Sequence, residues 1–209
     1  VYGDYRQFNK DEPIERQFVL LDGSVPRAFV PSVSQAMSML VGPQFLTSLS
    51  GASRVLRDVG RSNPPQEGAF NHSMLLLACG HDSCGGRYVL DGDGKAYVVW
   101  PNMQNEESFR YINTQMEQYA KRMGGKFIPN PRSSILGGDK MQATHPLGGA
   151  PMGTSVKTGV VNHLGQVFDP AGGVYEGLYV VDAAVIPHSL AAPPLITITA
   201  LAERMMRHF

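Results

Sequence analysis

Short apolar runs separated by turn residues fill the first half of the chain, and they predict strands. Residues 18–21 are apolar and stop at Asp22-Gly23, as expected of a strand that ends in a turn. The run at 73–78 is too short for a confident helix. It therefore predicts a buried strand.

Two further strands are predicted around a glycine-containing turn. Residues 87–90 and 95–100 flank 91–94 (Asp-Gly-Asp-Gly), which is typical of a hairpin that needs positive φ. The same four residues suggest a calcium loop, but the EF-hand pattern needs a Glu near its twelfth position, where Asn102 or Met103 stands. We interpret 91–94 as a turn and expect residues 73–100 to form three adjacent antiparallel strands.

Helical patterns occur at three places before residue 124. Residues 32–40 and 45–59 are compatible with helices, and the second stops at Gly60 as a helix C-terminus should. Between 106 and 123, apolar residues recur every three or four positions, which predicts an amphipathic helix lying on the sheet.

Residues 144–209 follow a different pattern. A glycine-rich turn at 145–149 precedes two short strand pieces around a turn at 160–168. A strand is predicted at 178–182, and a helix of small and apolar residues at 194–208. The whole chain therefore predicts an α+β fold.

Composition excludes some classes of partner. The chain has 209 residues with 18 basic and 18 acidic side chains, so no net charge favours nucleic acid or an anionic membrane. No apolar stretch approaches the roughly 20 residues that span a bilayer. The start is polar, has no Met and lacks a signal-peptide core. We expect a soluble chain cut from a longer polypeptide, of unknown location.

Cys79 and Cys84 are the only cysteines. Their spacing permits a disulfide, a pair of metal ligands or two free thiols. A structural metal site usually takes four nearby N or S ligands, so free thiols are favoured and no metal is expected.

The start of the last predicted helix is a candidate site for negative charge. Pro194 suits the first helical turn because its missing N–H would be unpaired there. The free amides of Leu195, Ile196 and Thr197 then favour partial negative charge, as a reduced flavin carries at its N1 and C2 carbonyl edge. A plain core helix is the alternative interpretation.

His145 precedes a proline and two glycines that would hold the backbone close to a ligand. A fixed imidazole accepts the hydroxyl proton as an alcohol gives up hydride. A purely structural histidine is the alternative.

Five ordered segments stand out in the terminal part of the chain: His145-Pro146-Leu147-Gly148-Gly149, residues 159–168, Gly177-Leu178-Tyr179-Val180-Val181-Asp182, Ile186-Pro187 and residues 195–204. Together they resemble the C-terminal signature of the glucose-methanol-choline (GMC) oxidoreductases, and within that family they resemble most the cholesterol-oxidase-like bacterial branch. The resemblance is dense over 144–209 and looser over 73–101.

This resemblance implies an enzyme that binds FAD and oxidises alcohols. Residues 1–143 would be part of a substrate-binding domain, with an antiparallel sheet backed by helices. Residues 144–209 would add the C-terminal strand and helix of the FAD-binding domain.

The resemblance also implies roles for single residues. His145 would be the active-site base, and Asp182 and Ala183 would approach the FAD ribityl and pyrophosphate. The amides after Pro194 would face the isoalloxazine.

The chain departs from the family pattern at three places. No G-x-G-x-x-G follows a strand, so the N-terminal dinucleotide-binding element is missing. We expect either an N-terminal FAD-binding chain of the same enzyme as a partner or a fragment of a longer protein. Weak or absent FAD binding by this chain alone is the consequence.

The other two departures concern catalytic groups. Pro193 stands where the family has an Asn or His that bonds the substrate oxygen, and proline has no donor. His188 is the candidate substitute, and an exposed turn histidine is the alternative. Cholesterol oxidases also use a carboxylate from an early strand. Asp22 is the candidate there, against a turn-forming Asp before Gly23.

We therefore predict the C-terminal part of an FAD-dependent oxidoreductase that removes hydride from a CH–OH carbon, with a sterol or another bulky apolar alcohol as substrate. Two alternatives stay open. One is a non-oxidising flavin-containing relative such as a lyase, and the other is a non-catalytic subunit that keeps the fold.

Overall fold

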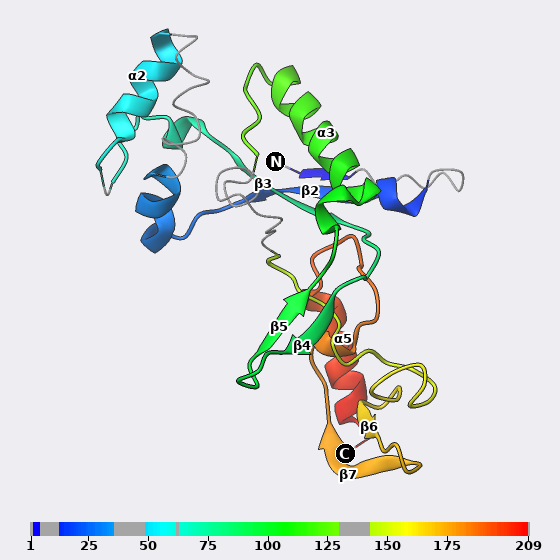
Figure 1. Cartoon of the computed structure of the whole chain (residues 1–209). Helices are drawn as coiled ribbons and strands as arrows, with labels where there is room; N and C mark the ends of the chain where they lie inside the picture. Colours follow the sequence, from blue (N-terminus) through cyan, green and yellow to red (C-terminus); the bar gives the residue numbers. More distant parts are fainter. Residues whose placement is uncertain (1, 5–12, 36–48, 62, 130–142, 209) are drawn as a thin grey trace. The chain divides into compact units, whose positions relative to one another are not determined.

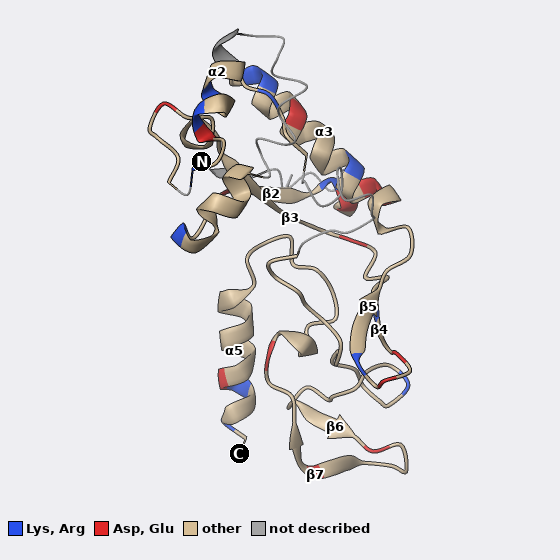
Figure 2. Ribbon diagram, turned by 60° about the vertical axis from the view of Figure 1, so that its left-hand side comes forward, with Lys and Arg blue, Asp and Glu red and all other residues tan. Residues whose placement is uncertain are grey.

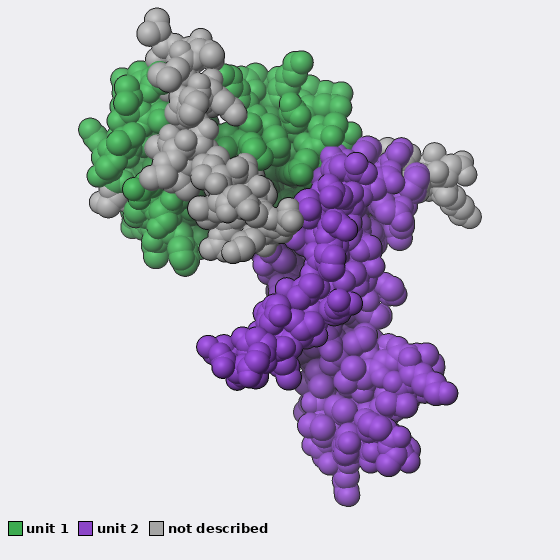
Figure 3. Space-filling model, in the orientation of Figure 1, with its two compact units in different colours: residues 1–3, 20–78, 112–142 green, residues 4–19, 79–111, 143–209 purple. Residues whose placement is uncertain are grey.

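The structure is a computed structural model in which two compact units can be distinguished (Figure 3). It describes residues 2–4, 13–35, 49–61, 63–129 and 143–208. Unit 1 comprises residues 1–3, 20–78 and 112–142, and unit 2 comprises residues 4–19, 79–111 and 143–209. The domain boundary between residues 143 and 144 was predicted from the family resemblance. The two compact units do not test that boundary, so it stays a prediction.

A three-stranded sheet contains the first strands in the order β1-β2-β3 (Figure 1). Its strands are β1 (Tyr2–Asp4), β2 (Phe18–Gly23) and β3 (Leu75–Gly80). The strand predicted at 18–21 is confirmed, but β2 continues through Asp22 and Gly23, where a turn was expected. The strand predicted at 73–78 is present two residues later, and its predicted burial is wrong, because Leu75 is 44% exposed and no residue of β3 is buried. Gly23 lies against Leu75 and Leu77 of β3, whose side-chain atoms would be 3.1 Å from a Cβ there. The close approach of β3 therefore explains why Gly23 continues the strand instead of forming a turn.

The predicted hairpin is confirmed. β4 (Arg87–Leu90) pairs antiparallel with β5 (Ala96–Val99). In the turn, Asp91 accepts hydrogen bonds through its carbonyl from Gly94 N–H at 3.0 Å and through Oδ1 from Lys95 N–H at 2.8 Å.

The prediction of three adjacent strands over 73–100 is wrong. Within the described ranges, β4 and β5 form a sheet of their own, whereas β3 lies beside β2. The cause is the segment at 81–86, which has no regular structure. It contains Cys84 at φ 54°, a left-handed conformation that breaks the continuation from β3 into a paired strand.

Helices lie close to where the sequence predicts them. They are α2 (Leu49–Asp58), α3 (Glu107–Arg122) and α5 (Leu195–Met206), with the short 3-10 turns η1 (Ile14–Arg16), η2 (Arg27–Phe29), η3 (Phe70–His72), η4 (Met103–Asn105) and η5 (Ala183–Val185). α3 ends before Gly124 at φ 73°, as the glycine pair predicted. The first residues of the helix predicted at 45–59, and residues 36–40 of the one predicted at 32–40, lie outside the described residues.

Two short strands precede α5 in the terminal segment. β6 (Gln166–Phe168) pairs antiparallel with β7 (Val174–Tyr179). The strand predicted at 178–182 therefore ends three residues early. The pairing stops after Val180 N–H, which donates to the Gly165 carbonyl at 2.8 Å, because Gly165 lies in the turn that begins at Asn162 and has φ 77°.

A small apolar core holds the terminal segment together, and we call it the terminal cluster: Val161, Val185, Ile186 and Met205, all at most 4% exposed. α5 supplies Met205, and Figure 2 shows few charged residues on this helix. The fold is mixed α+β with small antiparallel sheets, as predicted. Among the described residues, no helix has the length and apolar character needed to cross a membrane.

Candidate functional site

A backbone ladder brings the glycine turn after His145 beside η5. Gly148 N–H donates to the Ala183 carbonyl at 3.2 Å, and Ala150 N–H donates to the Ala184 carbonyl at 3.0 Å. Gly149 has φ 110°, and a Cβ there would lie 2.8 Å from the Tyr88 ring. This turn therefore requires glycine, and it places two predicted site segments side by side.

Asp182 and Ala183, the predicted FAD contacts, also stabilise the local fold. The Asp182 side chain caps η5, because its Oδ1 accepts the Ala184 N–H at 2.8 Å. The carboxylate is otherwise exposed. Contact with FAD stays a prediction for both residues.

The two predicted catalytic histidines each face a thiol of one short segment, residues 79–86, which we call the thiol loop. Cys79 Sγ lies 3.9 Å from His145 Nδ1, and Cys84 Sγ lies 3.4 Å from His188 Nδ1. Both imidazoles are exposed, and both cysteines are free thiols. The structure thus gathers His145 and His188 around one loop.

Both thiols favour their protonated form. Burial raises the pKa of the Cys79 thiol above its ordinary value. Burial also raises the pKa of Cys84, and the charges of Asp82 and Glu106 add to this rise, whereas a hydrogen bond from the Ser189 backbone opposes it. The described residues contain no group of three or more His, Cys, Asp or Glu that could hold a metal ion. These pairs are thiol–imidazole contacts.

The thiol loop is anchored near its start, at Gly80, and at its middle, at Ser83. Ser189 Oγ, next to His188, donates to the Gly80 carbonyl at 2.5 Å. Glu106 accepts from Ser83 N–H at 3.1 Å and from Trp100 Nε1 at 2.8 Å.

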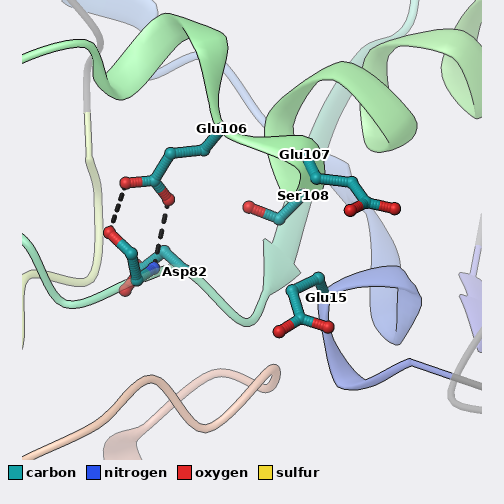
Figure 4. Close-up of a pocket in the computed structure, with 6 residues that line it drawn as sticks. Glu15, Asp82, Glu106, Glu107 and Ser108 are labelled. Carbon is teal, nitrogen blue, oxygen red and sulfur yellow. Dashed lines mark hydrogen bonds between the residues drawn. The ribbon is translucent and has the colours of Figure 1, made fainter.

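Glu106 belongs to a pocket of about 160 Å³ (Figure 4). Its lining residues are mostly acidic: Glu15, Asp82, Ser83, Glu106, Glu107 and Ser108. Protein donors already engage three of these acids, since Arg16 also pairs with Glu107 at 3.0 Å and Asp82 accepts the Cys84 N–H at 2.9 Å. We interpret the acidic side chains of this pocket as groups that hold the thiol loop in place.

The first turn of α5 has an uncapped N-terminus. Pro194 occupies the N-cap position with no side-chain cap hydrogen bond. The amides of the next three residues have no partner within the helix. Leu195 and Ile196 are 73% and 82% exposed, although both are large and apolar. Donor amides beside exposed apolar side chains fit a planar ring with a polar edge, as the isoalloxazine of FAD has.

Asp22, the predicted carboxylate base, is exposed on β2. It belongs to unit 1, whereas both histidines belong to unit 2. Its catalytic role stays a prediction.

Sequence reasoning noted the two cysteines but missed their partners. The contacts join residues 66 and 104 positions apart. No local spacing signals pairs so distant. Glu106, predicted only as the start of a helix, was missed for the same reason.

Comparison with known proteins places this geometry in context. Residues 36–202, more than half of the chain, match the family model described as GMC oxidoreductase. Over 120 residues the chain is 41% identical to a cholesterol oxidase of Acinetobacter baumannii, covering 57% of this chain and 19% of that protein. Pyridoxine 4-oxidase from Mesorbium loti aligns in its crystal structure with a TM-score of 0.46 and 19% identity, over 66% of this chain and 29% of that one. The chain therefore spans less than a third of either relative.

Proposed function

Because the chain belongs to the GMC oxidoreductase family, we propose that it is the C-terminal part of an FAD-dependent enzyme that oxidises the CH–OH group of an alcohol. The observation that carries the proposal is the gathering of His145 and His188 around the thiol loop. The 41% identity to a cholesterol oxidase favours a sterol or another bulky apolar alcohol as substrate.

His145 is the proposed general base. Its contact with Cys79 is long, at 3.9 Å, and involves Nδ1, so the Nε2 side of the ring remains available. An unprotonated Nε2 takes the hydroxyl proton of the substrate, which leaves the carbon ready to release hydride. The glycine turn after His145 holds the backbone that carries this imidazole.

His188 is the proposed hydrogen-bond donor to the substrate oxygen. Pro193 has no side-chain donor at the position where the family pattern has one. The ring of His188 is exposed and held beside Cys84. An imidazole N–H there supplies the donor that Pro193 lacks.

The groups that would hold FAD come from two segments. Asp182 and Ala183 would contact the ribityl and pyrophosphate, and the amides of Leu195, Ile196 and Thr197 would face the ring. When bound, FAD supplies the hydride acceptor. The exposed Leu195 and Ile196 also support a partner, since a cofactor or an N-terminal FAD-binding chain would cover them.

The test is His145→Ala in the complete FAD-loaded enzyme, with cholesterol as the first alcohol. Losing a general base should lower kcat by about a hundredfold or more. Thermal unfolding should not change because His145 is exposed. His208→Ala, another exposed histidine, is the matched control and should keep its activity.

Full turnover by His145→Ala would contradict the proposal and favour a non-catalytic subunit. A flavin that stays oxidised when alcohols are added without oxygen, while the enzyme still converts a substrate, would favour the lyase alternative.

A further inference from the structure

Cys84 holds a conformation that its side chain does not favour. It has φ 54°, a left-handed value that is uncommon for residues other than glycine. Residues in strained conformations persist only where surrounding contacts fix them, and they often occur at functional sites.

Several contacts fix the backbone around Cys84. Asp82 Oδ1 accepts the Cys84 N–H at 2.9 Å, which closes a local turn. Glu106 binds the adjacent Ser83 through both its N–H and its hydroxyl. Gly86 lies against the Trp100 ring, where a Cβ would come within 2.9 Å. The Cys84 sulfur lies 3.4 Å from His188 Nδ1 and 3.9 Å from the Asp82 carbonyl oxygen.

In the hydrogen bond between Cys84 and His188, one side chain is the preferred donor. Burial raises the pKa of Cys84, so the sulfur carries its proton near neutral pH. A thiol is a weak acceptor, whereas an unprotonated imidazole nitrogen accepts well. The Asp82 carbonyl competes for the thiol proton at 3.9 Å, and the shorter 3.4 Å contact therefore favours S–H donating to His188 Nδ1. The ring proton then resides on Nε2.

We propose that Cys84 is a positioning residue whose S–H bond to Nδ1 fixes His188 in the tautomer that presents Nε2–H as a donor to the substrate oxygen. This inference rests on the proposed role of His188. It explains why the thiol loop is anchored so firmly beside a histidine that replaces a missing amide or imidazole donor. The contact at His145 is longer, at 3.9 Å, and fixes the proton of that ring less strongly. The proton of His145 can therefore reside on Nδ1, which leaves Nε2 free to act as the proposed base.

The experiment compares Cys84→Ala, Cys84→Ser and His188→Ala in the complete FAD-loaded enzyme. Cys84→Ala should lower kcat about tenfold with little change in KM, as the loss of a group that orients a functional imidazole does. Cys84→Ser should restore most of kcat, because its hydroxyl also donates to Nδ1. The double variant Cys84→Ala/His188→Ala should have the same kcat as His188→Ala alone.

A second readout is independent of turnover. The ¹⁵N chemical shifts of the His188 ring report which nitrogen carries the proton, and they can be assigned by comparison with His188→Ala. The wild type should show Nε2–H, and Cys84→Ala should show a mixture of tautomers.

A wild-type ring with its proton on Nδ1, or an unchanged tautomer in Cys84→Ala, would overturn the proposal even if a variant folds poorly. Full turnover by His188→Ala would instead contradict the donor role of His188. The two failures are therefore distinguishable.

Discussion

The terminal cluster and the thiol loop lie in the same unit, yet different forces hold them in place. The terminal cluster is apolar, with Met205 and Val161 fully buried. The thiol loop is held mainly by polar contacts from Glu106, Asp82 and Ser189, and Cys84 within it is exposed. The cluster therefore supplies stability, while the loop lies against two imidazoles.

This difference predicts which substitutions should change stability and which should change activity. Burial of a full apolar side chain is worth about 1.5–3 kcal/mol, whereas a typical hydrogen bond contributes about 1 kcal/mol. Changes in and around the terminal cluster should lower the free energy of unfolding. Changes in the thiol loop should alter activity more than stability.

The largest loss of stability is expected where two backbones meet beside the terminal cluster. A Cβ on Gly159 would lie 2.4 Å from Gly153 N, a backbone atom that cannot move aside easily. Gly159→Ala should therefore lower the free energy of unfolding by about 3 kcal/mol, measured by urea denaturation. Gly92→Ala is the matched control, because a Cβ there meets nothing within 4 Å. Equal stability of the two variants would show that the backbones at 153 and 159 are not in close contact.

The same contrast explains what the sequence could predict. α3, α5 and the β4–β5 hairpin follow from local periodicity and turn residues, and the structure confirms them. The end of β7 at Tyr179 was missed, because it depends on where the partner strand meets the turn that contains Gly165. The partner of β3 was missed for a similar reason.

The candidate site shows the same limit. Local pattern and family resemblance were enough to single out His145 and His188. Their thiol partners were not predictable, since each contact depends on how the chain returns after 66 or 104 residues. The catalytic roles of His145, His188 and Asp22 and the cofactor contacts of Asp182 and Ala183 are all still predictions, because contacts with a cofactor and a substrate decide them.

A smaller effect on stability is expected at the anchor of the thiol loop. Glu106→Gln keeps the size of the side chain but removes the charge that strengthens the bonds from Ser83 and Trp100. The free energy of unfolding should fall by about 1.5 kcal/mol. Glu107→Gln is the control, since its exposed pair with Arg16 is worth at most about 1 kcal/mol. A larger loss in Glu107→Gln than in Glu106→Gln would contradict this assignment of the anchor.

The smallest effect is a dependence of stability on pH that the two thiols should produce. Burial raises the pKa of Cys79 and of Cys84 in the folded chain, while the unfolded chain has the ordinary thiol pKa of about 8.5. The folded state therefore holds the thiol protons at pH values where the unfolded state has lost them. The resulting stability is fully present below the ordinary pKa and is lost as pH rises through the raised values.

A Cys79→Ser/Cys84→Ser double variant isolates this contribution from the other groups that titrate at alkaline pH. Its free energy of unfolding should fall less steeply than that of the wild type above about pH 8.5. Cys79→Ser alone should remove the larger share, because Cys79 is partly buried and Cys84 is exposed. Parallel curves for wild type and double variant would mean that the thiols are equally solvated in both states. The thiol loop would then not hold the two thiols against the imidazoles. The contrast between a cluster that stabilises the fold and a loop that serves activity would be contradicted.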